Sequence, residues 1–145
     1  MKYRMAAALL SLAGFFVSLY LYLYKIGRIG TLACGTGGCE TVQASPFSHF
    51  LGLEVALYGV VGYLVLLVLS MDTLRRPLAG ISSRLLLIFS GTGLAFTIYL
   101  TYLELFVIKA ICRWCVGSAV IITLIFIVAL LDSRRRAAPP GSLSQ

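Results

Sequence analysis

The residues of this sequence that could do chemistry are four cysteines, which form two close pairs. Cys34 and Cys39 are separated by four residues, three of them glycines, and Cys112 and Cys115 form a C-x-x-C motif. Glycine adopts backbone angles closed to other residues, so the first pair can close a small disulfide ring. Residues i and i+3 share a helix face, so the second pair can meet at the first turn of a helix. The two pairs predict thiol–disulfide exchange, in which a thiolate attacks a disulfide.

The C-x-x-C pair has features that favour a reactive thiolate. The positive end of a helix dipole lowers the pKa of a thiol, and Arg113 adds a nearby positive charge. A flexible outer pair and a fixed inner pair predict a relay from a soluble protein to an acceptor in the membrane. Three other interpretations of the cysteines stay open, namely buried unreactive residues, a Cys₄ zinc site and two static disulfides.

The composition indicates the elements that must position these cysteines. Of 145 residues, 60% are hydrophobic and 12% are charged, and the mean hydropathy is +0.99. A typical soluble domain has about 25% charged residues, so these values argue against a cytosolic globular enzyme, a disordered chain and a coiled coil. Apolar blocks cover residues 5–24, 55–71, 85–103 and 111–131, and a membrane-spanning helix needs about 20 residues.

We therefore expect an all-α integral membrane fold, a bundle of four transmembrane helices with an outward loop or half-helix between the first two. Residues 1–133 would form this domain, and residues 134–145 a basic, disordered cytoplasmic tail. The first block could instead be a cleaved signal peptide. It ends in Tyr20, Tyr22 and Tyr24, which suit a membrane interface better than a cleavage site.

The basic residues predict the orientation of the bundle. Cytoplasmic loops carry an excess of Lys and Arg. With a cytoplasmic amino terminus, the cytoplasmic side holds Lys2, Arg4, Arg75, Arg76, Arg84, Arg134, Arg135 and Arg136, and the other side holds Lys25, Arg28, Lys109 and Arg113. Both termini are then cytoplasmic, and all four cysteines lie on the periplasmic or extracellular face, where disulfides persist. The basic residues behind the formal charge of +7 thus orient the bundle in the membrane and contact its anionic lipids. We expect no nucleic-acid partner.

The order of motifs resembles the bacterial branch of the vitamin K epoxide reductase (VKOR) family. Besides the loop cysteines and the C-x-x-C pair that opens the last helix, the motifs are Ser45-Pro46-Phe47, Phe50-Leu51-Gly52-Leu53 and Ala56-Leu57-Tyr58-Gly59. The resemblance covers nearly all of residues 5–131. It implies a four-helix bundle around a membrane quinone of the ubiquinone or menaquinone type.

The resemblance also implies a role for each matching residue. Cys34 would form the mixed disulfide with a thioredoxin-like (DsbA-like) protein, Cys39 would exchange with Cys112, and Cys115 would face the quinone. Ser45 matches a loop serine near the quinone head, although it equally fits a helix N-cap before a proline. The chain ends soon after the fourth helix, so we expect the thioredoxin-like partner to be a separate protein. The implied function is a quinone-dependent thiol oxidoreductase of the plasma (inner) membrane that supports disulfide-bond formation.

Several rival functions stay open. In the DsbB-like family of oxidases the C-x-x-C pair precedes the loop pair, and here the order is reversed. Reduction of vitamin K epoxide itself is less favoured, because Val55 and Ala119 stand where vertebrate members have polar quinone contacts. A membrane subunit without enzyme activity, held by structural disulfides or zinc, is the third alternative. Glu54 and Glu104 border the second and third helices on the outward side, and proton handling is one open role for each, since carboxylates within a membrane are functional candidates. His49 fits a position at the membrane surface better than a catalytic base, and the roles of all three residues are left open.

Overall fold

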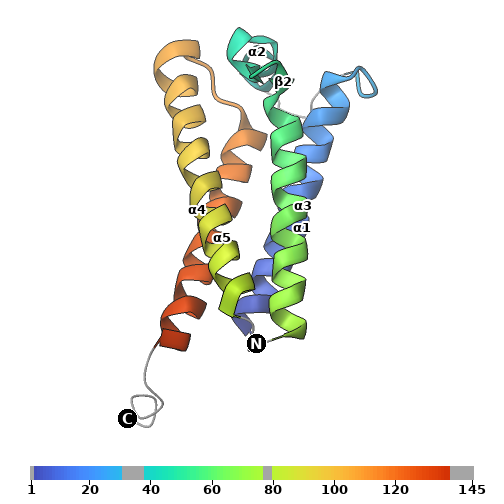
Figure 1. Cartoon of the computed structure of the whole chain (residues 1–145). Helices are drawn as coiled ribbons and strands as arrows, with labels where there is room; N and C mark the ends of the chain where they lie inside the picture. Colours follow the sequence, from blue (N-terminus) through green and yellow to red (C-terminus); the bar gives the residue numbers. More distant parts are fainter. Residues whose placement is uncertain (1, 31–37, 77–79, 138–145) are drawn as a thin grey trace.

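Four long helices run side by side through the structure. The computed structural model describes residues 2–30, 38–76 and 80–137. The long helices are α1 (Lys2–Lys25), α3 (Val55–Arg75), α4 (Gly80–Tyr102) and α5 (Arg113–Ala137) (Figure 1). All four are long and apolar enough to cross a membrane. The structure thus confirms the predicted four-helix membrane bundle.

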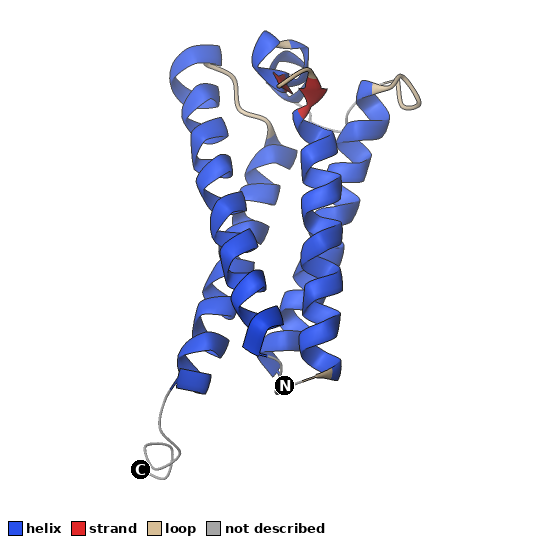
Figure 2. Cartoon of the chain, in the orientation of Figure 1, coloured by secondary structure: helices blue, strands red, loops and turns tan. Residues whose placement is uncertain are grey.

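The helices pack as a ring, in which α1 contacts α3 and α5 and α4 contacts the same two helices (Figure 2). The buried side of α1 is a stripe of small residues that recur every three or four positions, namely Ala7, Ser11, Gly14 and Ser18. This spacing keeps the residues on one helix face, and small side chains let helices approach closely in a membrane. The stripe therefore lets α1 pack closely against α3, and the ring of Tyr63 lies directly over Gly14.

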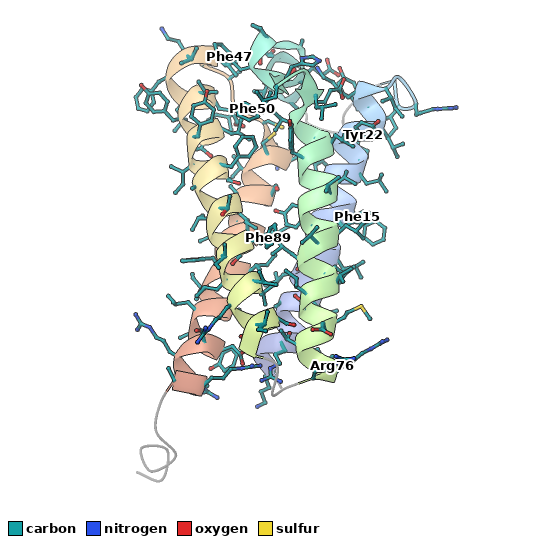
Figure 3. The ribbon with its side chains drawn as sticks, viewed as in Figure 1. Phe15, Tyr22, Phe47, Phe50, Arg76 and Phe89 are labelled. Atoms are coloured by element: carbon teal, nitrogen blue, oxygen red, sulfur yellow. The ribbon has the colours of Figure 1, made fainter. Side chains whose placement is uncertain are left out.

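Large apolar side chains lie on both sides of the helices. Tyr63, Leu66, Leu86, Ile122 and Ile125 are buried between the helices and form a core. Many other Leu, Ile, Val and Phe side chains are exposed on the outer faces, and the side chains in Figure 3 project outward along the whole length of the bundle. Extended exposed apolar surface of this kind is what a lipid-facing bundle requires.

A small cap closes the end of the bundle at which α1 ends and α3 begins. It contains α2 (Gly38–Ala44), the 3₁₀ turn η1 (Pro46–Ser48) and a hairpin of β1 (His49–Phe50) and β2 (Leu53–Glu54). The two turn residues, Leu51 (φ 54°) and Gly52 (φ 81°), both have positive φ, as a type I′ hairpin turn requires. The Phe50 ring packs on Phe96 of α4 and Tyr58 of α3, with centroids 5.6 and 6.0 Å apart. The hairpin therefore bridges α3 and α4.

Two helix ends differ from the sequence prediction. Beyond α4 the chain continues as a π-helical segment, η2 (Leu103–Ile108), which Lys109 closes with a left-handed φ of 57°. At the other end of the bundle, α5 continues through Ala137, so the start of the segment expected to be a disordered tail is helical. Asp132 pairs there with Arg4 (3.5 Å) and with Arg136 (3.2 Å), which helps to hold this last turn. Residues 138–145 lie outside the described residues.

Candidate functional site

Cys112 is the N-cap of α5. Its carbonyl oxygen accepts the Val116 N–H (3.0 Å), and its Sγ accepts the backbone N–H of Cys115 (3.3 Å). A capping side chain normally accepts this same N–H, and here the thiol does so. Cys115 lies within the first turn of α5, and its thiol is hydrogen-bonded to the thiol of Cys112. The structure therefore brings the predicted pair together, with Cys112 just before the helix and both thiols free.

The surroundings of Cys112 lower the pKa of its thiol. The largest cause is the hydrogen bond with the Cys115 thiol, and the backbone N–H groups of Cys115 and Trp114 also stabilise the thiolate. Burial and the charge of Glu104 act in the opposite direction without prevailing. A lower pKa increases the thiolate fraction of Cys112 near neutral pH, and the thiolate is the form that takes part in thiol–disulfide exchange.

Glu104 lies against the C-x-x-C pair. Its side chain is buried (5% exposed), its carboxylate accepts the backbone N–H of Cys112 at 3.3 Å, and it lines both of the cavities that Cys115 lines. The π-helical segment η2 holds it there, since the Glu104 carbonyl accepts the N–H groups of Lys109 and Ala110. Short π-helical segments occur frequently at functional sites. The sequence placed Glu104 near the membrane interface and left its role open.

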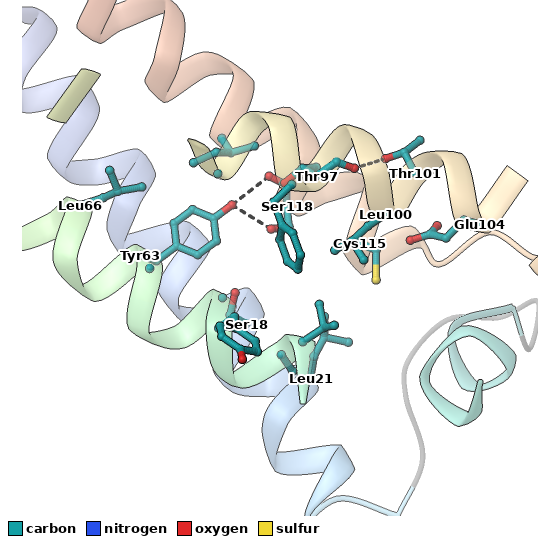
Figure 4. Close-up of a pocket in the computed structure, with 18 of the residues that line it drawn as sticks. Ser18, Leu21, Tyr63, Leu66, Thr97, Leu100, Thr101, Glu104, Cys115 and Ser118 are labelled. Atoms are coloured by element: carbon teal, nitrogen blue, oxygen red, sulfur yellow. Dashed lines mark hydrogen bonds between the residues drawn. The ribbon is translucent and has the colours of Figure 1, made fainter. Parts of the chain in front are cut away.

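A cavity of about 170 Å³ lies beside Cys115, between α1, α3, α4 and α5 (Figure 4). Much of its wall is apolar, including Leu21, Leu66, Phe89, Phe96, Leu100 and Ile122. The polar groups on its wall include Gln43, Tyr63, Thr97, Thr101, Glu104 and Cys115. A second cavity of about 40 Å³ lies under α2 and η1, and Cys115 and Glu104 also line it. The Cys115 thiol is thus at the place where the two cavities adjoin.

The outer cysteine pair is described in part. Cys39, at the start of α2, is disulfide-bonded and fully buried, whereas Cys34 lies outside the described residues. Cys39 belongs to the same buried cluster as Cys112, which is also 0% exposed. Gly38 lets α2 approach the segment before α5, because a Cβ on this residue would overlap the carbonyl oxygen of Ile111. The fold therefore packs the start of α2 against the residues that lead into the inner pair.

Ser45 lies at the smaller cavity, between α2 and η1. It is the N-cap of η1 and precedes Pro46, as one interpretation of the sequence predicted, although its side chain caps no N–H there. Its hydroxyl instead donates to the carbonyl of Val42 at 2.7 Å. Ser45 and Cys115 both line the smaller cavity. The hydroxyl proton is thus engaged within the protein, and a hydroxyl oxygen can also accept a hydrogen bond from a ligand.

The structure adds site residues that the sequence did not single out. The Gln43 side-chain amide points its nitrogen at the Cys115 sulfur, 3.8 Å away. Lys25, at the end of α1, donates to the Gln43 carbonyl and to the Ser48 hydroxyl (2.9 Å), which ties the cap to the bundle. In the cavity wall, the Tyr63 hydroxyl bonds the carbonyl (2.9 Å) and the hydroxyl (2.8 Å) of Ser118. No local pattern marks these residues, because each contact joins segments far apart in the chain.

His49 and Glu54 face one another across the hairpin and do not belong to the thiol cluster. Their side chains are 3.8 Å apart, and half of the His49 side chain is exposed. Within residues 2–30, 38–76 and 80–137, no three His, Cys, Asp or Glu side chains form a group that could hold a metal ion.

The comparison with known protein families agrees with this arrangement. Residues 5–130 match the model of the vitamin K epoxide reductase family. The match includes the loop cysteines, the cap, the C-x-x-C pair and all four long helices, and it confirms the resemblance seen in the sequence. The chain therefore belongs to the vitamin K epoxide reductase family, as a multi-pass membrane oxidoreductase whose chemistry is linked to quinone or vitamin K.

Proposed function

We propose that this protein is a quinone-dependent thiol oxidoreductase that supports disulfide-bond formation. It oxidises a separate thioredoxin-like (DsbA-like) protein through Cys34 and Cys39, and it passes the electrons through Cys112 and Cys115 to a membrane quinone. One observation carries the proposal: Cys115 lines the cavity and also packs against the buried cluster that contains Cys39 and Cys112.

The residues support a transfer of electrons in two exchanges. The dithiol of the partner reduces the Cys34–Cys39 disulfide and is itself oxidised. The outer dithiol then reduces a Cys112–Cys115 disulfide, so that each exchange breaks one S–S bond and forms another. The structure holds Cys39 oxidised and the inner pair as free thiols, which is the state that follows the second exchange. A bound quinone supplies the final acceptor, since it takes up two electrons and two protons.

The cavity fits the ring of a quinone. A cavity of about 150 Å³ is large enough to bind benzene, and this cavity measures about 170 Å³. Its apolar wall suits a ring system, and the few polar groups near Cys115 could orient the carbonyl oxygens. Gln43, Glu104 and Cys115 are the residues that would hold the head, with Ser45 at the adjoining smaller cavity. Val55 lines both cavities with an apolar side chain, which supports a respiratory quinone over vitamin K epoxide.

The orientation that we propose has both termini in the cytoplasm and the cysteines on the periplasmic or extracellular face. The start of α1 and the end of α5 lie at one end of the bundle, and the cap lies at the other (Figure 1). Arg76 lies at the end opposite Phe47 and Phe50 (Figure 3). The positive-inside rule supports a cytoplasmic location for that Arg-rich end.

The decisive experiment is quinone reduction by the purified protein in lipid nanodiscs, with a reduced thioredoxin-like protein as electron donor. Wild type should reduce ubiquinone or menaquinone and oxidise one partner dithiol for each quinol formed. Cys115→Ser should abolish quinone reduction and still form a mixed disulfide with the partner, because its outer pair is intact. Normal quinone reduction by Cys115→Ser would refute the assignment.

A thiol titration tests the non-enzymatic alternatives on the same sample. Redox-active pairs should cycle between four free thiols and none as dithiothreitol or quinone is added. A static structural site would resist mild reductant or contain stoichiometric zinc. Vitamin K epoxide, supplied in place of quinone with dithiol as the reductant, tests the remaining alternative.

A further inference from the structure

We propose that Glu104 is the proton acceptor of the Cys115 thiol when the Cys112–Cys115 disulfide forms. The proposal rests on the proposed function and assigns to a residue of the π-helical segment a catalytic task within it. The Glu104 carboxylate accepts the backbone N–H of Cys112 at 3.3 Å, and Glu104 lines the same two cavities as Cys115. A general base must lie close to the proton that it removes, and this placement puts the Glu104 carboxylate beside the C-x-x-C pair.

A buried carboxylate at this place is costly to the fold. Glu104 is 5% exposed within a membrane-spanning helix, where an acidic side chain loses several kcal/mol of hydration. No Lys, Arg or His side chain forms a salt bridge with it in the part of the chain that the structure describes. A hydroxyl or an amide could accept the Cys112 N–H equally well. Stability therefore does not account for an acid here, whereas proton transfer requires one.

The backbone holds this carboxylate toward the thiols. A π-helical turn holds more residues than an α-helical turn. The side chains of η2 therefore point in directions different from those that a continuous α-helix would give them. The chain then reverses at Lys109, and the Cys112 N–H bonds the Glu104 carboxylate at 3.3 Å. The same bond ties the acid to the N-cap of α5, so Glu104 and Cys115 keep a constant relative position.

The proposed step balances in electrons and protons. Formation of the Cys112–Cys115 bond breaks two S–H bonds and releases two electrons and two protons, and both electrons go to the quinone. One proton passes from Cys115 to Glu104 and then to a quinol oxygen. The other leaves Cys112 for water, and the quinol takes its second proton from water. Glu104 is thus returned to its ionised form at the end of each turnover.

Alkylation of Cys115 tests the step without any quinone or partner. In a Cys112→Ser background Cys115 is the single inner thiol, and serine is a good N-cap, so the start of α5 is kept. The rate of reaction with N-ethylmaleimide is followed at Cys115 by peptide mass spectrometry over a range of pH. The variant Glu104→Gln keeps the size of the side chain. Its amide oxygen can still accept the backbone N–H of residue 112, but the amide cannot take up a proton. Glu54→Gln is the matched control, because Glu54 lies on the hairpin away from the thiols.

If Glu104 takes the proton, the reactive form has the proton on the acid and the charge on sulfur. The population of this form does not change with pH as long as Glu104 and Cys115 together hold one proton. The rate of alkylation should therefore be independent of pH near neutral pH. With Glu104→Gln the rate should rise about tenfold per pH unit, as for an isolated thiol below its pKa. Glu54→Gln should keep the flat profile.

Two results would overturn the proposal. A flat profile that persists in Glu104→Gln would show that Cys115 shares its proton with another group. A tenfold slope in the Cys112→Ser parent itself would exclude a shared proton, and this test holds even if Glu104→Gln does not fold. Glu104→Asp, which keeps an acid, should retain the flat profile.

Quinone reduction gives a second readout that separates this proposal from the proposed function. Glu104→Gln should lower kcat by about 100-fold, the usual effect of losing a general base, with KM for quinone unchanged. A wild-type kcat in this variant would overturn the role of Glu104 and leave the quinone oxidoreductase intact. A wild type that reduces no quinone but has the flat alkylation profile would instead overturn the proposed function alone.

Discussion

The contact between Gly14 and Tyr63 predicts a large loss of stability when Gly14 is replaced by alanine. The added Cβ would lie 2.5 Å from Cδ1 and 2.6 Å from Cζ of the Tyr63 ring, and closer still to Cε1. Carbon atoms in van der Waals contact are about 3.5–4.0 Å apart. The ring and the new methyl group would therefore overlap by about 1 Å or more, and α1 and α3 or the ring must move.

The magnitude follows from what holds the ring in place. Tyr63 is 5% exposed, and its hydroxyl bonds both the carbonyl and the side chain of Ser118. Overpacking of a core costs about 1–3 kcal/mol, and an interhelical hydrogen bond in a membrane protein contributes about 0.6 kcal/mol. If the ring moves and both bonds break, the two effects together give about 2–4 kcal/mol.

The assay is the free energy of unfolding in mixed micelles titrated with sodium dodecyl sulfate. The matched control is Gly62→Ala, because among the described residues no atom outside the local helix backbone lies within 4 Å of the Cβ position of Gly62. Its expected effect is neutral to about 1 kcal/mol stabilising, from the higher helix propensity of alanine. In a Tyr63→Ala background, Gly14→Ala should cost almost nothing, since the overlapping ring is gone. The reasoning is wrong if Gly14→Ala costs no more than Gly62→Ala, or costs the same with and without the ring.

Two further predictions concern the cysteines. Cys115→Ala should raise the pKa of Cys112, because the largest cause that lowers this pKa is removed, and the alkylation of Cys112 should shift to higher pH. Cys115→Ser, which keeps a hydrogen-bond donor, should shift the pH profile of Cys112 alkylation less. An unshifted profile in Cys115→Ala would contradict the Cys115 thiol as the main cause of the lowered pKa. The second prediction is that Gly38→Ala should push α2 away from the Ile111 carbonyl and slow exchange between Cys39 and Cys112 by up to about 100-fold, as measured by acid quench and thiol trapping. Alkylation of Cys115 is the internal control and should be unchanged, and a normal exchange rate would show that α2 tolerates the added Cβ.

Much of the fold follows from the chain itself because the bilayer imposes simple rules. A helix satisfies its own backbone hydrogen bonds, so apolar runs of about 20 residues predict spanning helices. The helix ends were less predictable. The chain continues from Leu103 to Ile108 as the π-helical segment η2, and α5 continues beyond residue 133, where Asp132 forms ion pairs with Arg4 and Arg136.

The functional site likewise has features that the local sequence predicts and others that depend on the packing of distant segments. The i, i+3 spacing of Cys112 and Cys115 is local, and it predicted that the two thiols meet at the start of a helix. The placement of Glu104 and Gln43 beside the C-x-x-C pair was not predictable, because η2 and α2 approach it from positions distant in the chain. Ser45 shows the intermediate case, in which the turn before Pro46 was visible in the sequence and the cavity beside it was not.

By itself, the sequence determined that this protein crosses a membrane four times and carries a close-spaced dithiol at the start of the last helix. Those properties depend on local composition and on the helical repeat. Only the tertiary structure decided that Cys115 lines a cavity, that Cys39 and Cys112 share one buried cluster, and that the Glu104 carboxylate bonds the Cys112 backbone and lines the same cavities as Cys115. The physical reason is that cavities and buried hydrogen bonds arise from the packing of separate segments, and no single segment contains that information.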